Sequence, residues 1–201
     1  IPKEKHYQDV LILDYEDTAD VVDKLLDREV VLEGNIHLKS LIKERSGNIP
    51  FMAVLMIEAY KKQGNLEIAD KDQVLKCLLK SSNRIEYKQE NALKALSMFE
   101  PLGYLNTVSD EYRYVANSFK IHNIAENQET IDRIFEGTIN TFKSRQLIEI
   151  AGSCLRVRPK PLAEWLTEAW MDENESVFGE VYNEIINQEE GLSNRLSRAL
   201  D

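Results

Sequence analysis

The strongest indication of the fold is the sequence LIEIAGSCLRVR, residues 147–158. It contains two short runs separated by Ala-Gly-Ser, a composition typical of a hairpin turn. In the second run, Leu155 and Val157 alternate with Arg156 and Arg158. Because successive side chains of a strand point to opposite faces, the apolar pair shares one face and the arginines share the other. The stretch therefore predicts a β-hairpin with one basic face.

The segment before this hairpin predicts a long helix from about Gln128 to Leu147. Its apolar residues recur at helical spacing: Ile131, Ile134, Phe135, Ile139 and Phe142. Further upstream we expect a helix from Lys88 to Phe99, a break at Pro101, and a short strand around Tyr112 and Tyr114. Helices followed by a long helix and a hairpin form the order of a winged helix, in which the hairpin is the wing.

The first part of the chain has the pattern of a small bundle of short helices. A helix capped by Asp17 or Thr18 precedes a second one from about Asn35 to Arg45, which ends at Ser46-Gly47-Asn48. The third, from Ile49 to Lys62, is apolar almost all round, which predicts a position in the middle of the bundle. A fourth helix is expected around four apolar residues: Val74, Leu75, Leu78 and Leu79.

After the hairpin, Pro159 and Pro161 predict a strand end and a helix start. That helix is expected to bury one of the two tryptophans, Trp165 or Trp170, and two more amphipathic helices follow it. The fold class expected is therefore mainly α.

The composition is that of an ordinary globular protein, because 43% of the 201 residues are hydrophobic and 30% are charged. No apolar run approaches the roughly 20 residues of a membrane helix, so we expect a cytoplasmic protein that does not contact a membrane. The chain opens on Ile1-Pro2 without Met, from which we expect a segment of a longer protein. The net charge of −10 argues against broad nucleic-acid binding.

The sequence indicates no catalytic residue and no metal site. It contains no phosphate-binding GxxxxGK(S/T) loop, and neither GxGxxG, HExxH nor GxSxG occurs. The carboxylates at Glu16-Asp17 and at 172–175 lie in helix-capping contexts, where solvated charge is the favoured interpretation. The cysteines and histidines are scattered and have no metal-ligand spacing. We therefore expect that the chain alone is not an enzyme.

The stretch SGNIPFMAVL, residues 46–55, resembles a junction in the helical lid of AAA+ ATPases and of the STAND group, the NACHT and NB-ARC type switches. In that family a glycine-containing turn leads into a lid helix. AAA+ members often follow the glycine with an arginine that reaches the phosphates, whereas STAND members have a proline that packs on adenine. This resemblance implies that Gly47, Asn48 and Pro50 contact the nucleotide. Here Asn48 and Ile49 separate Gly47 from Pro50, whereas the usual STAND form has one residue at that point.

Two later stretches extend the resemblance to about residues 5–171. The sequence ALKALSMF at 92–99, followed by LGY at 102–104, is similar to the first winged-helix segment of bacterial STAND-type proteins. The sequence RVRPKPLA at 156–163 is similar to the end of that domain. The resemblance implies a lid-like bundle at 1–81, a winged-helix domain at 82–171 and a C-terminal helical extension at 172–201.

As a whole, the resemblance implies a regulatory fragment of a nucleotide-switched ATPase used in signalling or phage defence. Its partner would be an upstream P-loop core of the same protein, which would bind ATP or ADP, and the protein would form a homo-oligomer. The alternatives are a winged-helix DNA-binding regulator and a protein-interaction module.

Arg156, Arg158 and Lys160 form a compact basic patch on the wing. It could contact nucleotide phosphates, a DNA backbone or only solvent. Acidic residues on the preceding long helix, including Glu129, argue against insertion of that helix into DNA.

Overall fold

The computed structural model describes residues 15–63, 75, 87–188 and 190–200. The chain divides into two compact units, residues 1–69 and 70–201, which are described separately. As expected, the protein is mainly helical, with a small three-stranded antiparallel sheet in the second unit. The helix expected around Val74–Leu79 lies outside the described residues, apart from Leu75. The expected boundary between residues 81 and 82 also lies outside them.

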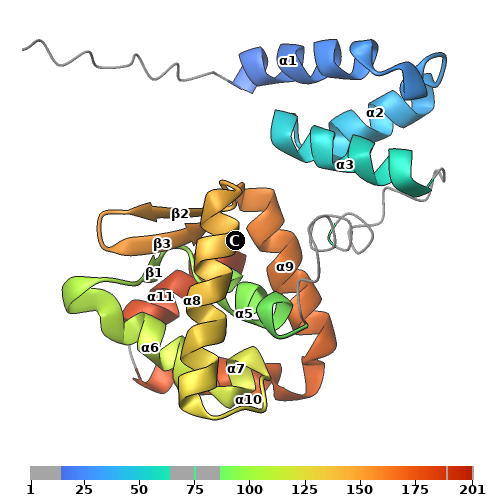
Figure 1. Cartoon of the computed structure of the whole chain (residues 1–201). Helices are drawn as coiled ribbons and strands as arrows, with labels where there is room; N and C mark the ends of the chain where they lie inside the picture. Colours follow the sequence, from blue (N-terminus) through green and yellow to red (C-terminus); the bar gives the residue numbers. More distant parts are fainter. Residues whose placement is uncertain (1–14, 64–74, 76–86, 189, 201) are drawn as a thin grey trace, which may run out of the picture. The chain divides into compact units, whose positions relative to one another are not determined.

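The first unit contains α1 (Tyr15–Arg28), the 3-10 turn η1 (Val30–Leu32), α2 (Ile36–Arg45) and α3 (Pro50–Gln63) (Figure 1). Asn35 starts α2, because its Oδ1 accepts a hydrogen bond from the amide of Leu38 at 3.0 Å. Lys43 binds Asp23 at 2.6 Å and ties α2 to α1 at the surface. All three helices contribute to one small core: Val22, Leu26, Leu38, Ile42, Met52 and Met56.

The expectation that α3 is covered on all sides is not met for two of its residues. Met52, Ala53, Met56 and Ile57 are buried, whereas Phe51 and Val54 are 39% and 40% exposed. Among the described elements of this unit, α1 and α2 pack against α3. Two helices cover one side of a third, so its apolar residues on the other side remain accessible.

The second unit is built around α5 (Tyr87–Ser97), which packs between α8 (Gln128–Ser144) and α9 (Lys160–Glu173) (Figure 1). Every residue from Asn91 to Phe99 is buried. The remaining helices are short or peripheral: η3 (Asn106–Val108), α6 (Ser109–Asn117), α7 (Phe119–His122), α10 (Glu175–Gln188) and α11 (Glu190–Leu200). Within the described residues no helix is long and apolar enough to cross a membrane.

The hairpin expected at 147–158 is confirmed as β2 (Ile148–Ala151) and β3 (Cys154–Val157). Leu155 and Val157 are 0% and 1% exposed, and the two arginines lie on the other face. A third strand, β1 (Leu102–Gly103), pairs Leu102 with Leu155 and gives the order β1-β3-β2. The sequence indicated only a break there, because a two-residue strand is stabilised by its distant partner and not by a local pattern.

The long helix before the hairpin is also confirmed, as α8, and Asn127 caps its first turn through Thr130 at 2.9 Å. The strand expected around Tyr112 and Tyr114 is wrong, because both residues lie in α6. The acidic first turn of α6 favours a helix start. Two of its three buried residues, Glu111 and Val115, are four positions apart and so share one helical face.

The C-terminal helix α11 is fixed to β1 through Glu111 and Arg195. The Arg195 Nε lies 2.7 Å from Glu111 Oε2, and the Arg195 Nη1 donates a hydrogen bond to the Pro101 carbonyl at 2.6 Å. The same Glu111 oxygen accepts a hydrogen bond from the amide of Gly103 at 2.6 Å. One carboxylate therefore joins α6, β1 and α11.

Candidate functional site

The turn between α2 and α3 is a tight, left-handed connection. Gly47 has φ +59° and Asn48 has φ +58°. Glycine and asparagine are the residues that adopt this conformation most readily. Pro50 begins α3, where a helix loses no hydrogen bond because the first amides have no partner within the helix. The fold alone therefore accounts for the residue types at all three positions.

The amides of this turn are used inside the turn. The Gly47 amide donates to the Glu44 carbonyl at 3.1 Å, and the Ile49 amide donates to the Ser46 carbonyl at 3.0 Å. Ser46 is completely buried and its hydroxyl donates to the Lys43 carbonyl. These groups do not form a cradle for a phosphate. Pro50 is half-buried.

The structure brings Arg156, Arg158 and Lys160 to the exposed face of β3 and the start of α9, and each has an acidic neighbour. The Arg158 Nε lies 3.1 Å from Glu149 Oε2. The Arg156 Nε is 3.7 Å from Glu100 Oε1, and the Lys160 Nζ is 3.6 Å from Glu164 Oε1. These carboxylates lower the positive potential of the patch. The turn belongs to the first unit and the basic patch to the second.

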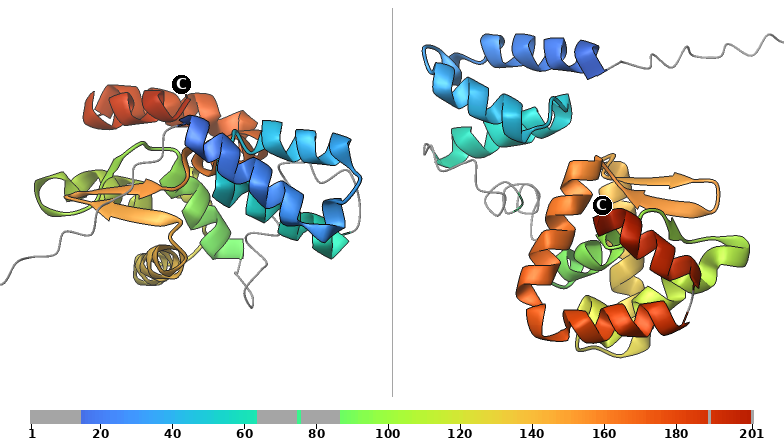
Figure 2. Two further views of the ribbon diagram at one scale, coloured as in Figure 1. Left: turned by 90° about the horizontal axis from the view of Figure 1, so that it is seen from above. Right: turned by 180° about the vertical axis from the view of Figure 1, so that it is seen from behind.

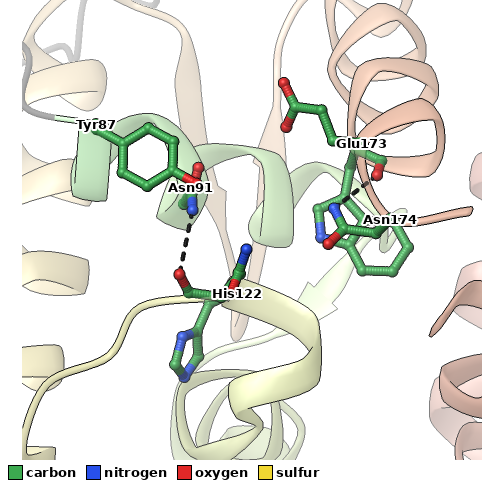
Figure 3. Close-up of a pocket in the computed structure, with 7 residues that line it drawn as sticks. Tyr87, Asn91, His122, Glu173 and Asn174 are labelled. Carbon is green, nitrogen blue, oxygen red and sulfur yellow. Dashed lines mark hydrogen bonds between the residues drawn. The ribbon is translucent and has the colours of Figure 1, made fainter. Parts of the chain in front are cut away.

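A polar cavity of about 270 Å³, which no sequence pattern indicated, lies where α5, α7 and the end of α9 meet (Figure 3). Its lining includes three amides: Asn91, Asn123 and Asn174. The Asn91 Nδ2 donates to the Asn123 carbonyl at 3.4 Å, and the Asn174 Nδ2 donates to the Trp170 carbonyl at 2.8 Å. These hydrogen bonds hold the cavity wall together and leave fewer groups for a ligand.

His122 also lines this cavity, and Figure 3 shows its ring pointing away from Asn91. The His122 Nδ1 accepts a hydrogen bond from the Ile124 amide at 3.0 Å, which requires this nitrogen to be unprotonated. Burial lowers the pKa of His122, and the Ala116 carbonyl opposes this effect in part. The neutral ring is therefore part of the native packing.

Lys94 stands next to the cavity and is almost completely buried. Its Nζ lies 2.7 Å from Glu173 and 2.9 Å from Glu90, so α5 and α9 are joined by an ion-pair network. Burial alone lowers the pKa of Lys94, but hydrogen bonds with Glu173 and Glu90 outweigh it and raise the pKa. The available signal in the sequence was the presence of Asn91 and Lys94 in the segment 91–99, which is apolar apart from these two residues and Ser97.

No group of three or more potential metal ligands occurs among the residues that the structure describes. The comparisons with protein-family models, with curated proteins and with solved structures find no match to this chain.

Proposed function

We propose that this chain is the regulatory lid and winged-helix region of a nucleotide-switched P-loop ATPase of the STAND and AAA+ type. The observation that carries the proposal is the turn at 46–50. A glycine-containing, left-handed turn leads directly into a helix that begins at a half-buried proline. The sequence of this turn is the part of the chain that resembles the lid junction of those ATPases.

In this proposal Pro50 packs on the adenine of ATP or ADP, while an upstream core binds the phosphates. A proline ring cannot stabilise the charge that develops on a transferred phosphate. The amides of the turn are already bonded within it, which supports the same division of roles. Such a lid suits a protein that retains a nucleotide and changes state, more than one that hydrolyses ATP rapidly.

The second unit supports the winged-helix part of the proposal through its order of elements. A buried helix, a short strand, shorter helices, the long α8 and a hairpin follow one another. The short strand β1 completes a sheet with the hairpin. In the proposed switch this domain keeps the lid closed until a trigger arrives, and differential contacts of about 5.5 kcal/mol suffice to reverse such an equilibrium.

A DNA-binding role is disfavoured by the charges of both elements that would contact DNA. The cations of the hairpin face carboxylates. The exposed side of α8 presents Glu129, Asp132 and Glu136, whereas recognition helices use basic and polar residues to reach phosphates and bases.

The first test is the reading frame upstream of Ile1. A GxxxxGK(S/T) loop is expected roughly 150 to 250 residues earlier, given an ATPase core of ordinary domain size. A reading frame that encodes no such loop overturns the proposal.

The second test compares two proline variants of the full-length protein, each changed in the first turn of a helix. Pro50→Ala removes two ring methylenes, worth about 0.8 kcal/mol each if they pack on adenine. We therefore expect up to roughly tenfold faster release of ADP, measured with a fluorescent nucleotide. Pro161→Ala, in the first turn of α9, is the matched control and is expected to leave ADP release unchanged. Equal release rates in the wild type and in Pro50→Ala exclude the role assigned to Pro50.

A further inference from the structure

The end of α9 and the start of α10 line a hollow of about 300 Å³. Figure 2 shows the sharp change of direction between these two consecutive helices, in orange. Two apolar and two acidic side chains line the hollow: Met171, Phe178, Asp172 and Glu175. Met171 and Phe178 are half-buried, whereas both carboxylates are exposed. The hollow therefore combines an apolar floor with an acidic rim.

The apolar floor continues along the outer side of α10. Phe178, Tyr182 and Ile186 follow one another at four-residue spacing, which places them on one helical face. Tyr182 and Ile186 are 36% and 44% exposed, although α10 has a separate buried face formed by Val181 and Ile185. The Phe178 ring contacts Trp170 at 6.4 Å and Tyr182 at 6.0 Å between centroids. The stripe is thus positioned by the fold and is accessible.

The rim is also distinct from the other acidic residues of these helices. Glu173 pairs with Lys94, and Glu180 and Glu184 pair with Lys120. Asp172 and Glu175 make no ion pair with any residue that the structure describes. Residues 161–194 contain nine Asp and Glu and no Lys, Arg or His. The negative charge beside the hollow therefore has no cation within its own segment.

We propose that this hollow and the α10 stripe are a docking site for a basic amphipathic helix of a partner protein, anchored by an arginine. The arginine stem would lie on Met171, its guanidinium would stack on Phe178, and its donors would bind Asp172 and Glu175. Apolar residues of the same helix would cover Tyr182 and Ile186.

Arginine fits this hollow better than lysine because its charged group is planar and carries several hydrogen-bond donors. Its planar guanidinium stacks on an aromatic ring while it donates hydrogen bonds to two carboxylates at its edges. Its methylenes bury against apolar surface at the same time. Lysine has only a compact, strongly hydrated point charge.

Charge complementarity also selects the class of partner. A nucleic acid or an anionic lipid surface is repelled by an acidic rim. A second copy of this chain in a two-fold symmetric contact would bring the same acidic rim against itself, at a net charge of −10 for each copy. A basic helix is the occupant that neutralises the rim and covers the stripe together.

The test is an NMR titration of the isotope-labelled chain, which detects weak binding. The probe is an alanine-based helical peptide of about 14 residues, with leucines on one face and arginines beside them. We expect chemical-shift changes concentrated at residues 171–186, and weaker binding at high salt. Peptides with lysine or glutamate in place of arginine should bind more weakly or not at all.

Two double variants with the same change in net charge separate the docking site from general attraction. Asp172→Asn with Glu175→Gln is expected to weaken binding roughly three- to tenfold, as for two exposed ion pairs. Glu129→Gln with Asp132→Asn, on α8, is the matched control and should leave binding unchanged. Absence of shifts at residues 171–186, equal weakening by both double variants, or equal affinity for the arginine and lysine peptides each overturns the proposal.

Discussion

Gly103 is the glycine, among those that the structure describes, at which an added Cβ would meet the closest neighbours. A Cβ at this position would lie 2.4 Å from the Val108 carbonyl oxygen and 2.6 Å from the Glu111 carboxylate. The first of these atoms belongs to the backbone and cannot rotate away. The second also binds the amide of Gly103 and pairs with Arg195. The need for glycine here comes from close approach and not from an unusual backbone angle.

The substitution Gly103→Ala should therefore destabilise the protein by at least about 2 kcal/mol, through steric overlap and loss of buried hydrogen bonds. The measurement is urea unfolding followed by circular dichroism. Gly179→Ala in α10 is the control, because a Cβ there meets nothing within 4 Å. It should stabilise the chain by about 0.5–1 kcal/mol, the usual gain for a helical position. Equal effects of the two substitutions would contradict this account.

His122 gives the protein a predicted dependence on pH. Its pKa is lower in the folded state than the unfolded value of about 6.5, because burial disfavours the charged ring. The unfolded chain therefore takes up a proton as the pH falls through about 6.5, and the native ring stays neutral. Above about pH 6.5 the protein has all the stability that the neutral His122 ring contributes. Below that pH the free energy of unfolding falls by about 1.4 kcal/mol for each pH unit over which the native ring remains neutral.

The measurement is the free energy of unfolding between about pH 5 and pH 8 for wild type and His122→Gln. The variant should show a flatter profile below about pH 6.5, since it lacks the titrating ring. His37→Gln, at an exposed position of α2, is the control for a histidine-to-glutamine change at the surface. A wild-type profile that is already flat from pH 5 to pH 8 would refute the role given to His122.

At the scale of single elements, α5 and α9 are joined by a buried cation and two partly exposed carboxylates. Lys94→Met keeps the aliphatic volume, and both carboxylates can return to water, so we expect a change in unfolding free energy within about 1 kcal/mol. Glu90→Gln with Glu173→Gln instead leaves a buried ammonium without its partners and should cost about 3 kcal/mol.

Urea unfolding of both variants tests this order of effects. Arg133→Met, which removes an exposed pair between Arg133 and Glu129, should change stability by less than about 0.5 kcal/mol and serves as the reference. A larger loss of unfolding free energy for Lys94→Met than for Glu90→Gln with Glu173→Gln would contradict this prediction and would mean that the ion-pair network contributes net stability.

Helices and strands whose apolar residues recur regularly over several positions could be predicted from the sequence. Those that depend on contacts with distant parts of the chain could not. The regular apolar spacing of α8 and the alternation in β3 each span several residues, so both predictions hold. Tyr112 and Tyr114 form too short an alternation to distinguish a strand from α6. Trp165 and Trp170 are both buried, although one was expected, because α9 is covered on more than one side. The cavity beside Asn91 needs three helices to form, and no one of them indicates it.

At the scale of the whole molecule, each unit has a core of its own. A fragment of residues 70–201 should therefore unfold cooperatively. A fragment of residues 1–69 should be only marginally stable, because so small a domain buries little surface. Calorimetry of both fragments and of the full chain checks this, and a fragment 70–201 without a cooperative transition would contradict it.

The position of the two tryptophans has a spectroscopic consequence. Trp165 and Trp170 both lie in α9, so the chain has no tryptophan in the first unit. Indole fluorescence therefore reports on the second unit alone, whereas ellipticity reports on the helices of both. Because Trp170 contacts Phe178, occupation of the hollow should also change this emission. In one unlabelled chain, a change in ellipticity without a change in emission therefore indicates a change in the first unit, whereas a change in emission indicates the second unit.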